Sequence, residues 1–212
     1  MVSVIIVNAC VSFNSFQSPK VVKDNPRGGL GMSPNFELTE KEDTERFYNL
    51  ELLYRAPLFK NADFGSRIGF LSQEKEFEYI FDIFPFLYYY ADVKYQFFNG
   101  PVSISPVLGL LISPTSFNID PPPFTLYPSI LIGNDLFYLG LKNVWFINNK
   151  INFSKKYDKV FLWGIGIGSM FGKNIKINPE LNIINVQDLK NAIYTVGISI
   201  QMDFIEKQDV EP

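Results

Sequence analysis

The chain has 212 residues, a formal net charge of −3, a single cysteine and no histidine. One domain accommodates this length, and a slightly acidic chain is not expected to bind nucleic acid. The missing histidine removes the commonest general base and a common metal ligand, so we expect no enzyme, no metal site and no cofactor. Ser–Lys catalysis needs no histidine, but no motif points to it.

The N-terminal segment, residues 1–10, ends in an apolar stretch followed by Cys10. It resembles the end of a bacterial lipoprotein signal, in which the cysteine is acylated after cleavage. Lipidation of Cys10 is therefore one interpretation, and a plain secretory signal remnant with a chance cysteine is the other. Residues 11–26 contain Pro19 and Pro26, which interrupt regular structure, and are predicted to form a polar periplasmic tether.

From residue 27 to 204 apolar and polar residues alternate with a period of two, which indicates β-strands. The predicted runs are 27–36, 47–55, 63–71, 90–98, 101–112, 124–132, 136–146, 160–171, 175–185 and 192–204. Their lengths are close to the about 9–11 residues that a tilted membrane strand needs. Pro34, Pro106, Pro128 and Pro179 fall inside these runs. They are expected to mark bulges, strand ends or a weakened strand pair.

Side chains two residues apart share a face, and each run has one apolar face without charge. In a membrane barrel this face points to lipid, and large aromatic residues are predicted there: Trp145, Trp163, Phe161 and Phe171. The opposite face collects charges and is predicted to line the lumen. Its charged members are Arg27, Glu51, Arg55, Asp63, Arg67, Asp92, Lys94, Lys142, Lys176, Glu180 and Asp203, six basic and five acidic. Their nearly balanced signs favour mutual ion pairing inside a narrow barrel, with a small channel or ligand pocket as the alternative.

The gaps between runs alternate between short and long, as in outer-membrane barrels with periplasmic turns and external loops. Asn99-Gly100 is a strong hairpin signal. This order puts both chain ends in the periplasm, including a tail at 205–212. The long segments 72–89 and 113–123 are predicted to carry any extracellular ligand or partner.

The last run, 195–204, resembles the C-terminal signal that the barrel-assembly machinery reads, with alternating apolar residues ending in Phe204. The pattern over 27–204 resembles small bacterial outer-membrane barrels in general. This resemblance implies an all-β, antiparallel, up-and-down transmembrane barrel in the bacterial outer membrane, with the lipid bilayer and the assembly machinery as partners. About ten strands are expected, with eight or twelve as alternatives.

Three functions fit this sequence. The first is a non-enzymatic barrel with an ion-paired, largely filled lumen that acts as an envelope anchor or surface interaction module. The second is a narrow channel or transporter for small solutes or hydrophobic molecules, with a lateral opening beside Pro106 or Pro128. The third is a soluble periplasmic lipid-binding β-barrel or sandwich, which would put the apolar face inside.

Overall fold

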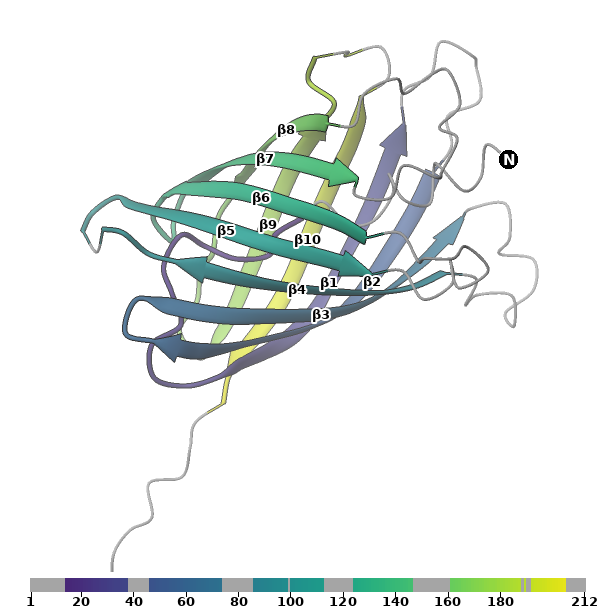
Figure 1. Cartoon of the computed structure of the whole chain (residues 1–212). Coiled ribbons are helices and arrows are strands. Elements are labelled where there is room, and N and C mark those ends of the chain that lie inside the picture. Colours follow the sequence, from purple (N-terminus) through teal and green to yellow (C-terminus); the bar gives the residue numbers. More distant parts are fainter. Residues whose placement is uncertain are drawn as a thin grey trace, which may run out of the picture.

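The computed structural model describes residues 14–37, 46–73, 86–98, 100–112, 124–146, 161–187, 189 and 192–204. These residues form a closed barrel in which every strand pairs antiparallel with its sequence neighbours and β1 pairs with β10 (Figure 1). The strands are β1 (Arg27–Glu37), β2 (Arg46–Phe59), β3 (Ala62–Gln73), β4 (Phe86–Tyr95), β5 (Ser103–Ile112), β6 (Phe124–Gly133), β7 (Tyr138–Phe146), β8 (Phe161–Gly168), β9 (Ile175–Ile184) and β10 (Ile193–Asp203). The prediction of an antiparallel up-and-down barrel of about ten strands is confirmed.

The barrel has two different ends. At the short-turn end, which also holds the start of β1 and the end of β10, the turns are Lys60–Asn61, 96–102, 134–137 and 169–174. At the opposite end, called here the long-loop end, the connections are 38–45, 74–85, 113–123, 147–160 and 185–192. The predicted alternation of short and long connections is therefore correct.

Two predicted boundaries differ from the structure by four residues, and the others by three or fewer. Residues 56–59 were expected in a turn, but they extend β2, which shifts register against β3 between Pro57 and Phe59. β4 begins at Phe86 rather than at residue 90, and the predicted ligand segment 72–89 therefore includes the end of β3 and the start of β4. The rest of that segment and all of 113–123 lie outside the described residues, as do Cys10 and 205–212.

The prolines within the strands lie where pairing is interrupted. Pro34 falls in a gap of the β1–β10 ladder, between Met32 and Asn35. Pro128 falls in a gap of the β6–β7 ladder, and the β4–β5 ladder ends one residue short of Pro106. Proline has no N–H to donate to a neighbouring strand. A closed barrel can therefore include it where the ladder is interrupted or ends.

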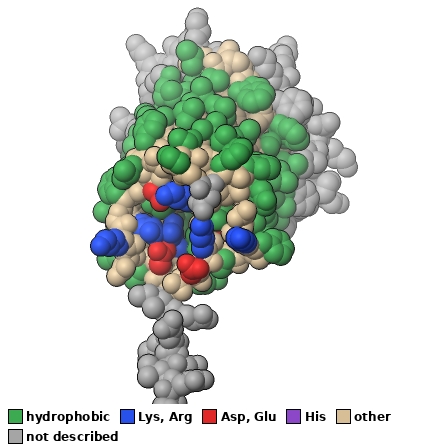
Figure 2. Space-filling model, turned by 90° about the vertical axis from the view of Figure 1, so that its left-hand side faces the viewer, with side chains coloured by type: hydrophobic (Ala, Val, Ile, Leu, Met, Phe, Trp, Pro, Cys, Tyr) green, Lys and Arg blue, Asp and Glu red, His purple; other side chains and the backbone are tan. Residues whose placement is uncertain are grey.

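An apolar belt covers the outer surface. Each strand contributes exposed apolar side chains, which include Leu30, Leu52, Ile68, Val93, Leu108, Ile130, Leu141, Trp163, Leu181 and Ile198. No outward-facing strand side chain that the structure describes carries a charge. Figure 2 shows the belt around the short-turn end, with charged groups confined to the mouth.

Among the described residues, no helix has the length and apolar character needed to cross a membrane. The same part of the chain holds no group of three or more acidic, cysteine or histidine side chains placed to bind a metal ion.

Candidate functional site: the filled lumen

The lumen contains a buried network of charges that begins with Arg55. The Arg55 guanidinium on β2 donates hydrogen bonds to the carboxylates of Asp63 and Asp92, the latter at 2.5 Å. Lys94 on β4 places its Nζ 3.3 Å from the second oxygen of Asp63. These side chains come from three neighbouring strands whose register brings Asp63 opposite Lys94. Because all four are buried, each charge is neutralised by a partner rather than by water.

A second group lies around Glu51 and Arg67. The two side chains are 3.5 Å apart, and Tyr88 donates its hydroxyl hydrogen to Glu51. The Arg67 guanidinium lies 3.8 Å from the centroid of the Tyr90 ring, in cation–π geometry. A carboxylate and a guanidinium thus share the interior with two tyrosines.

A third group centres on Glu180 of β9. Lys142 of β7 reaches across β8 to donate hydrogen bonds to Glu180 at 2.8 Å and to Asn182 at 2.6 Å. This reach is open because the inward positions of β8 between them are Gly164, Gly166 and Gly168. The hydroxyl of Tyr138 also donates to Glu180, at 3.2 Å.

The N-terminal segment 14–22, called here the plug, runs through this network. The backbone amides of Ser15 and Phe16 both donate to the Glu180 carboxylate, each at 2.9 Å. Phe16 has a φ of 47°, in the left-handed region, and two successive amides aimed at one carboxylate form an anion-binding nest. The Glu180 charge is therefore held by Lys142 from the wall and by amides from the plug.

Further contacts fix the plug toward the short-turn end. Lys94 Nζ donates to the carbonyl oxygens of Ser18 and Lys20 at 2.9 and 2.7 Å. The amide of Val22 donates to Asp63 at 2.8 Å. The plug therefore supplies both donors and acceptors to the buried charges, which explains how an irregular segment satisfies its backbone inside a barrel.

Residues 11–26 were predicted to form a periplasmic tether, but residues 14–22 of that segment lie inside the barrel, while Lys23 and Asp24 are exposed. A side chain on Gly31 would begin 2.7 Å from the Phe16 ring, and one on Gly197 would begin 2.5 Å from Asn14 Cγ. Glycines on β1 and β10 thus leave the space that the plug fills. The tether prediction relied on prolines and polarity, and neither property distinguishes a solvated linker from a segment that crosses a polar lumen.

Nearer the long-loop end, the interior is closed by a layer of apolar and aromatic side chains. Its members are Tyr88, Tyr90, Leu111, Tyr127, Val144, Leu162, Ile184 and Ile193. The Tyr90 and Tyr127 rings meet edge to face with centroids 5.9 Å apart. The lumen is therefore filled in two different ways: by the plug and its ion pairs, and by this layer.

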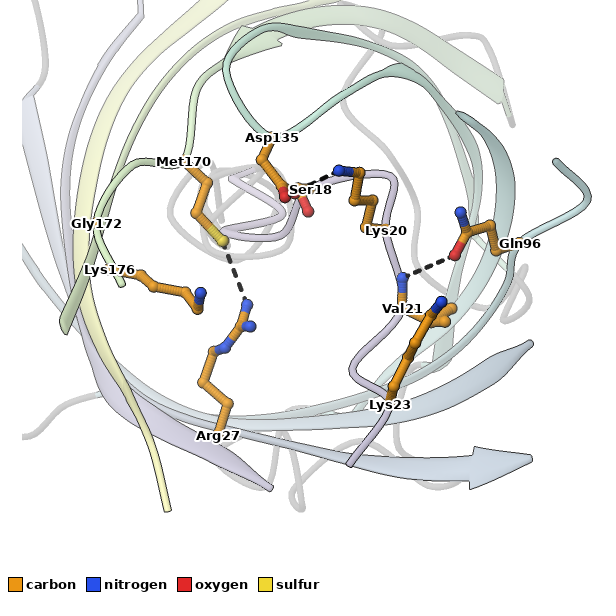
Figure 3. Close-up of a pocket in the computed structure, with 10 residues that line it drawn as sticks. All are labelled: Ser18, Lys20, Val21, Lys23, Arg27, Gln96, Asp135, Met170, Gly172 and Lys176. Carbon is orange, nitrogen blue, oxygen red and sulfur yellow. Dashed lines mark hydrogen bonds and ion pairs between the residues drawn. The ribbon is translucent and has the colours of Figure 1, made fainter. Parts of the chain in front are cut away.

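The mouth at the short-turn end is basic and open to solvent. Figure 3 shows Lys20, Lys23, Arg27 and Lys176 around a cavity of about 280 Å³ where the plug leaves the barrel. Lys20 lies 3.5 Å from Asp135, and Arg27 lies 2.6 Å from Asp203. This mouth ends at the buried plug.

The sequence-predicted lumen residues lie as follows. Glu51, Arg55, Arg67, Asp92, Lys94, Lys142 and Glu180 are buried inside the barrel. Lys176 faces the same way but lies at the short-turn rim, 3.5 Å from Asp203. Trp145, Trp163 and Phe171 are exposed on the outside, by 41%, 56% and 45%. Phe161 belongs to β8, but its side chain lies outside what the structure describes.

Four tyrosines of the lumen were missed, among them Tyr127, which shares the buried face of β6 with Thr125. Tyr88 and Tyr90 have the same strand parity as Asp92, and Tyr138 has that of Lys142. Starting the fourth run at Phe86 would have placed Tyr88 and Tyr90 inside. No pattern in the sequence identifies residues 14–22 as part of the lumen.

The position of the plug predicts one specific disulfide. In a Cys10→Ser background, cysteines replacing Asn14 and Gly197 bring their Cβ atoms within about 4 Å, the range that a disulfide needs. We expect spontaneous cross-linking, seen as a mobility change on a non-reducing gel. The matched control pairs Asn14→Cys with Ile198→Cys, because Ile198 is the next residue and faces outward. Equal cross-linking of the two pairs would contradict a plug inside the barrel.

The sequence matches no protein-family model and no curated protein. Among solved structures, outer membrane phospholipase A from Escherichia coli is 13% identical, with 83% of this chain and 92% of that one covered and a TM-score of 0.40. The translocator domain of the autotransporter NalP from Neisseria meningitidis is 10% identical, with 95% and 94% covered and a TM-score of 0.38. Neisserial surface protein A is 9% identical, with 85% and 98% covered and a TM-score of 0.38.

Proposed function

We propose that the chain is a bacterial outer-membrane β-barrel with a sealed lumen, which acts as an envelope anchor or surface interaction module and not as an enzyme. The observation that supports this proposal most directly is the distribution of side chains, which is the reverse of that in a water-soluble protein. Ile198 and Trp163 are 45% and 56% exposed on the outside, while Lys94 and Glu180 are 1% and 3% exposed inside. In water this arrangement would leave a large apolar belt exposed, whereas in lipid it removes that belt from water.

The belt argues against a soluble lipid-binding barrel. Such a protein would have its apolar face inside around the ligand, with its charges in water. The described strands have the opposite arrangement, and a bilayer is the solvent that suits them.

The filled lumen argues against a channel for small solutes. Ions would have to pass both the plug at Glu180 and the apolar layer that includes Tyr88 and Leu162. The same filling supports a non-enzymatic role, since the buried carboxylates of Glu51, Asp63 and Glu180 are already bonded to neighbouring groups. The part of the barrel left for recognition is the long-loop end, which by its loop lengths faces the outside of the cell.

Two partners belong to this proposal. The bilayer follows from the belt. The barrel-assembly machinery is proposed as a partner because residues 195–204 resemble a C-terminal insertion signal. Acylation of Cys10 is a separate part of the proposal, based on the resemblance of residues 1–10 to a lipoprotein signal. Predicted ligand binding at 72–89 and 113–123 would complete the surface module.

Planar-bilayer recording tests the sealed lumen. The wild-type protein and the protein locked by Asn14→Cys and Gly197→Cys are both expected to give no steady ion conductance, because locking retains a plug that is already in place. Prior flotation with lipid vesicles establishes that the protein is in the bilayer. Steady single-channel steps from either protein would contradict the sealed lumen, and failure to float would contradict the membrane location.

A further inference from the structure

In the wall formed by β5, β6 and β7, the β5–β6 ladder is continuous and the β6–β7 ladder is interrupted. The β6–β7 ladder pairs Leu126 with Trp145 and then Ser129 with Lys142. Tyr127 and Pro128 therefore pass Asn143 and Val144 without pairing. Pro128 lies in this gap and has no N–H to donate, and on the other side of the wall the β4–β5 ladder ends one residue short of Pro106.

A groove of about 890 Å³ lies on the outer face over this interruption. Its volume is within the about 300–1,000 Å³ typical of ligand pockets. Apolar outward side chains line it: Val93, Leu108, Ile130, Leu141, Trp145 and Trp163. Most of the groove's lining is apolar and the groove lies within the apolar belt, so an alkyl chain is the ligand group that it suits.

Four residues with polar side chains line the groove, Tyr95, Ser129, Lys142 and Asn143, and Asn143 is the one with an unpaired acceptor. It is an amide on the outward-facing side of β7 and is directly opposite Trp163 in the β7–β8 ladder. The residue lines the groove although it is only 7% exposed, and its buried Oδ1 has no hydrogen-bond partner among the described residues. An acceptor left unpaired in an apolar setting is stabilised by any donor that reaches it.

The charges around the groove limit which polar headgroup could accompany an alkyl chain bound there. Lys142 also lines it, but its ammonium is bonded to Glu180 and Asn182 on the lumen side. No other lining residue is charged. An anionic headgroup would therefore find no free cation, while a neutral donor would find the Asn143 oxygen.

We propose that this groove binds a single-chain membrane amphiphile whose uncharged headgroup donates a hydrogen bond, such as a hydroxyl or an amide. The alkyl chain lies along Leu108, Ile130 and Trp163, and the donor reaches Asn143 Oδ1 after a small side-chain rotation. This inference rests on the proposed membrane location. It goes beyond the surface-module function by giving the barrel wall a ligand site that does not use the lumen.

The two tryptophans of the chain, Trp145 and Trp163, both line the groove, so tryptophan fluorescence reports on it directly. Purified protein in phosphatidylcholine vesicles is titrated with a dibrominated C18 alcohol and, separately, with its methyl ether, which has the same chain without the donor. We expect saturable quenching by the alcohol and an apparent affinity about five- to tenfold weaker for the ether.

Variants separate the groove from the belt. Val93→Phe fills the groove and is expected to abolish saturable quenching, while Val196→Phe on β10 makes the same change on another exposed part of the belt and is expected to leave it intact. Asn143→Leu is expected to retain quenching but to remove the preference for the alcohol. Linear quenching that is equal for both probes, or quenching unaffected by Val93→Phe, would overturn the proposal. A protein that fails to float with the vesicles would instead contradict the membrane location.

Discussion

Arg55→Met is expected to lower the free energy of unfolding by about 3–5 kcal/mol, because it leaves the buried carboxylate of Asp92 without its cation partner and removes one of the two cations beside Asp63. Arg55 bonds to both Asp63 and Asp92, and the two acids are less than 3% exposed. Lys94 contacts Asp63 as well, at 3.3 Å, but Asp92 would lose its guanidinium partner altogether. Methionine keeps much of the volume, so the loss reports on charge rather than on a cavity.

Urea unfolding of the protein folded into lipid vesicles measures this change. Arg27→Met is the matched control, because Arg27 pairs with Asp203 at the solvated short-turn rim and its replacement is expected to cost at most about 1 kcal/mol. Equal losses for the two variants would mean that water screens the interior charges, which would contradict a filled lumen.

The strands of this barrel were predictable because lipid imposes a strict rule on one face. In β10, Val196, Ile198 and Ile200 alternate with Gly197 and Ser199, and the structure places the first set outside and the second inside. The same requirement for an apolar outward face acts on every strand, so each strand's inward and outward positions can be predicted from its own sequence. That is why the strand boundaries agree to within a few residues at most ends.

The partners within the lumen were less predictable, because they depend on register across strands distant in sequence. Lys142 reaches Glu180 over the glycines of β8, and no local pattern specifies that pairing. Depth along a strand is also hidden, which is why Lys176 has the predicted orientation but lies at the rim.

The plug could not be predicted from alternation, because it has none. Ser15 and Phe16 bind Glu180 through their backbone amides. Because every residue except proline has such an amide, the sequence does not indicate which ones bind. The prolines gave a partial signal: Pro106 and Pro128 indicated a weakened wall, and an interruption of the ladder lies beside Pro128.

The central claim is that the apolar face of the barrel contacts hydrocarbon, and Ile198→Arg tests it most directly. Ile198 is 45% exposed at the middle of β10, and Met202 is 52% exposed on the same face near the short-turn rim. In a bilayer, arginine at the midplane costs about 2–4 kcal/mol and arginine near the interface about 0–1 kcal/mol. Reversible unfolding from vesicles is therefore expected to show a loss at Ile198→Arg that exceeds the loss at Met202→Arg by about 1–4 kcal/mol. Two small and equal losses would mean that this face contacts water, and the membrane barrel would be contradicted.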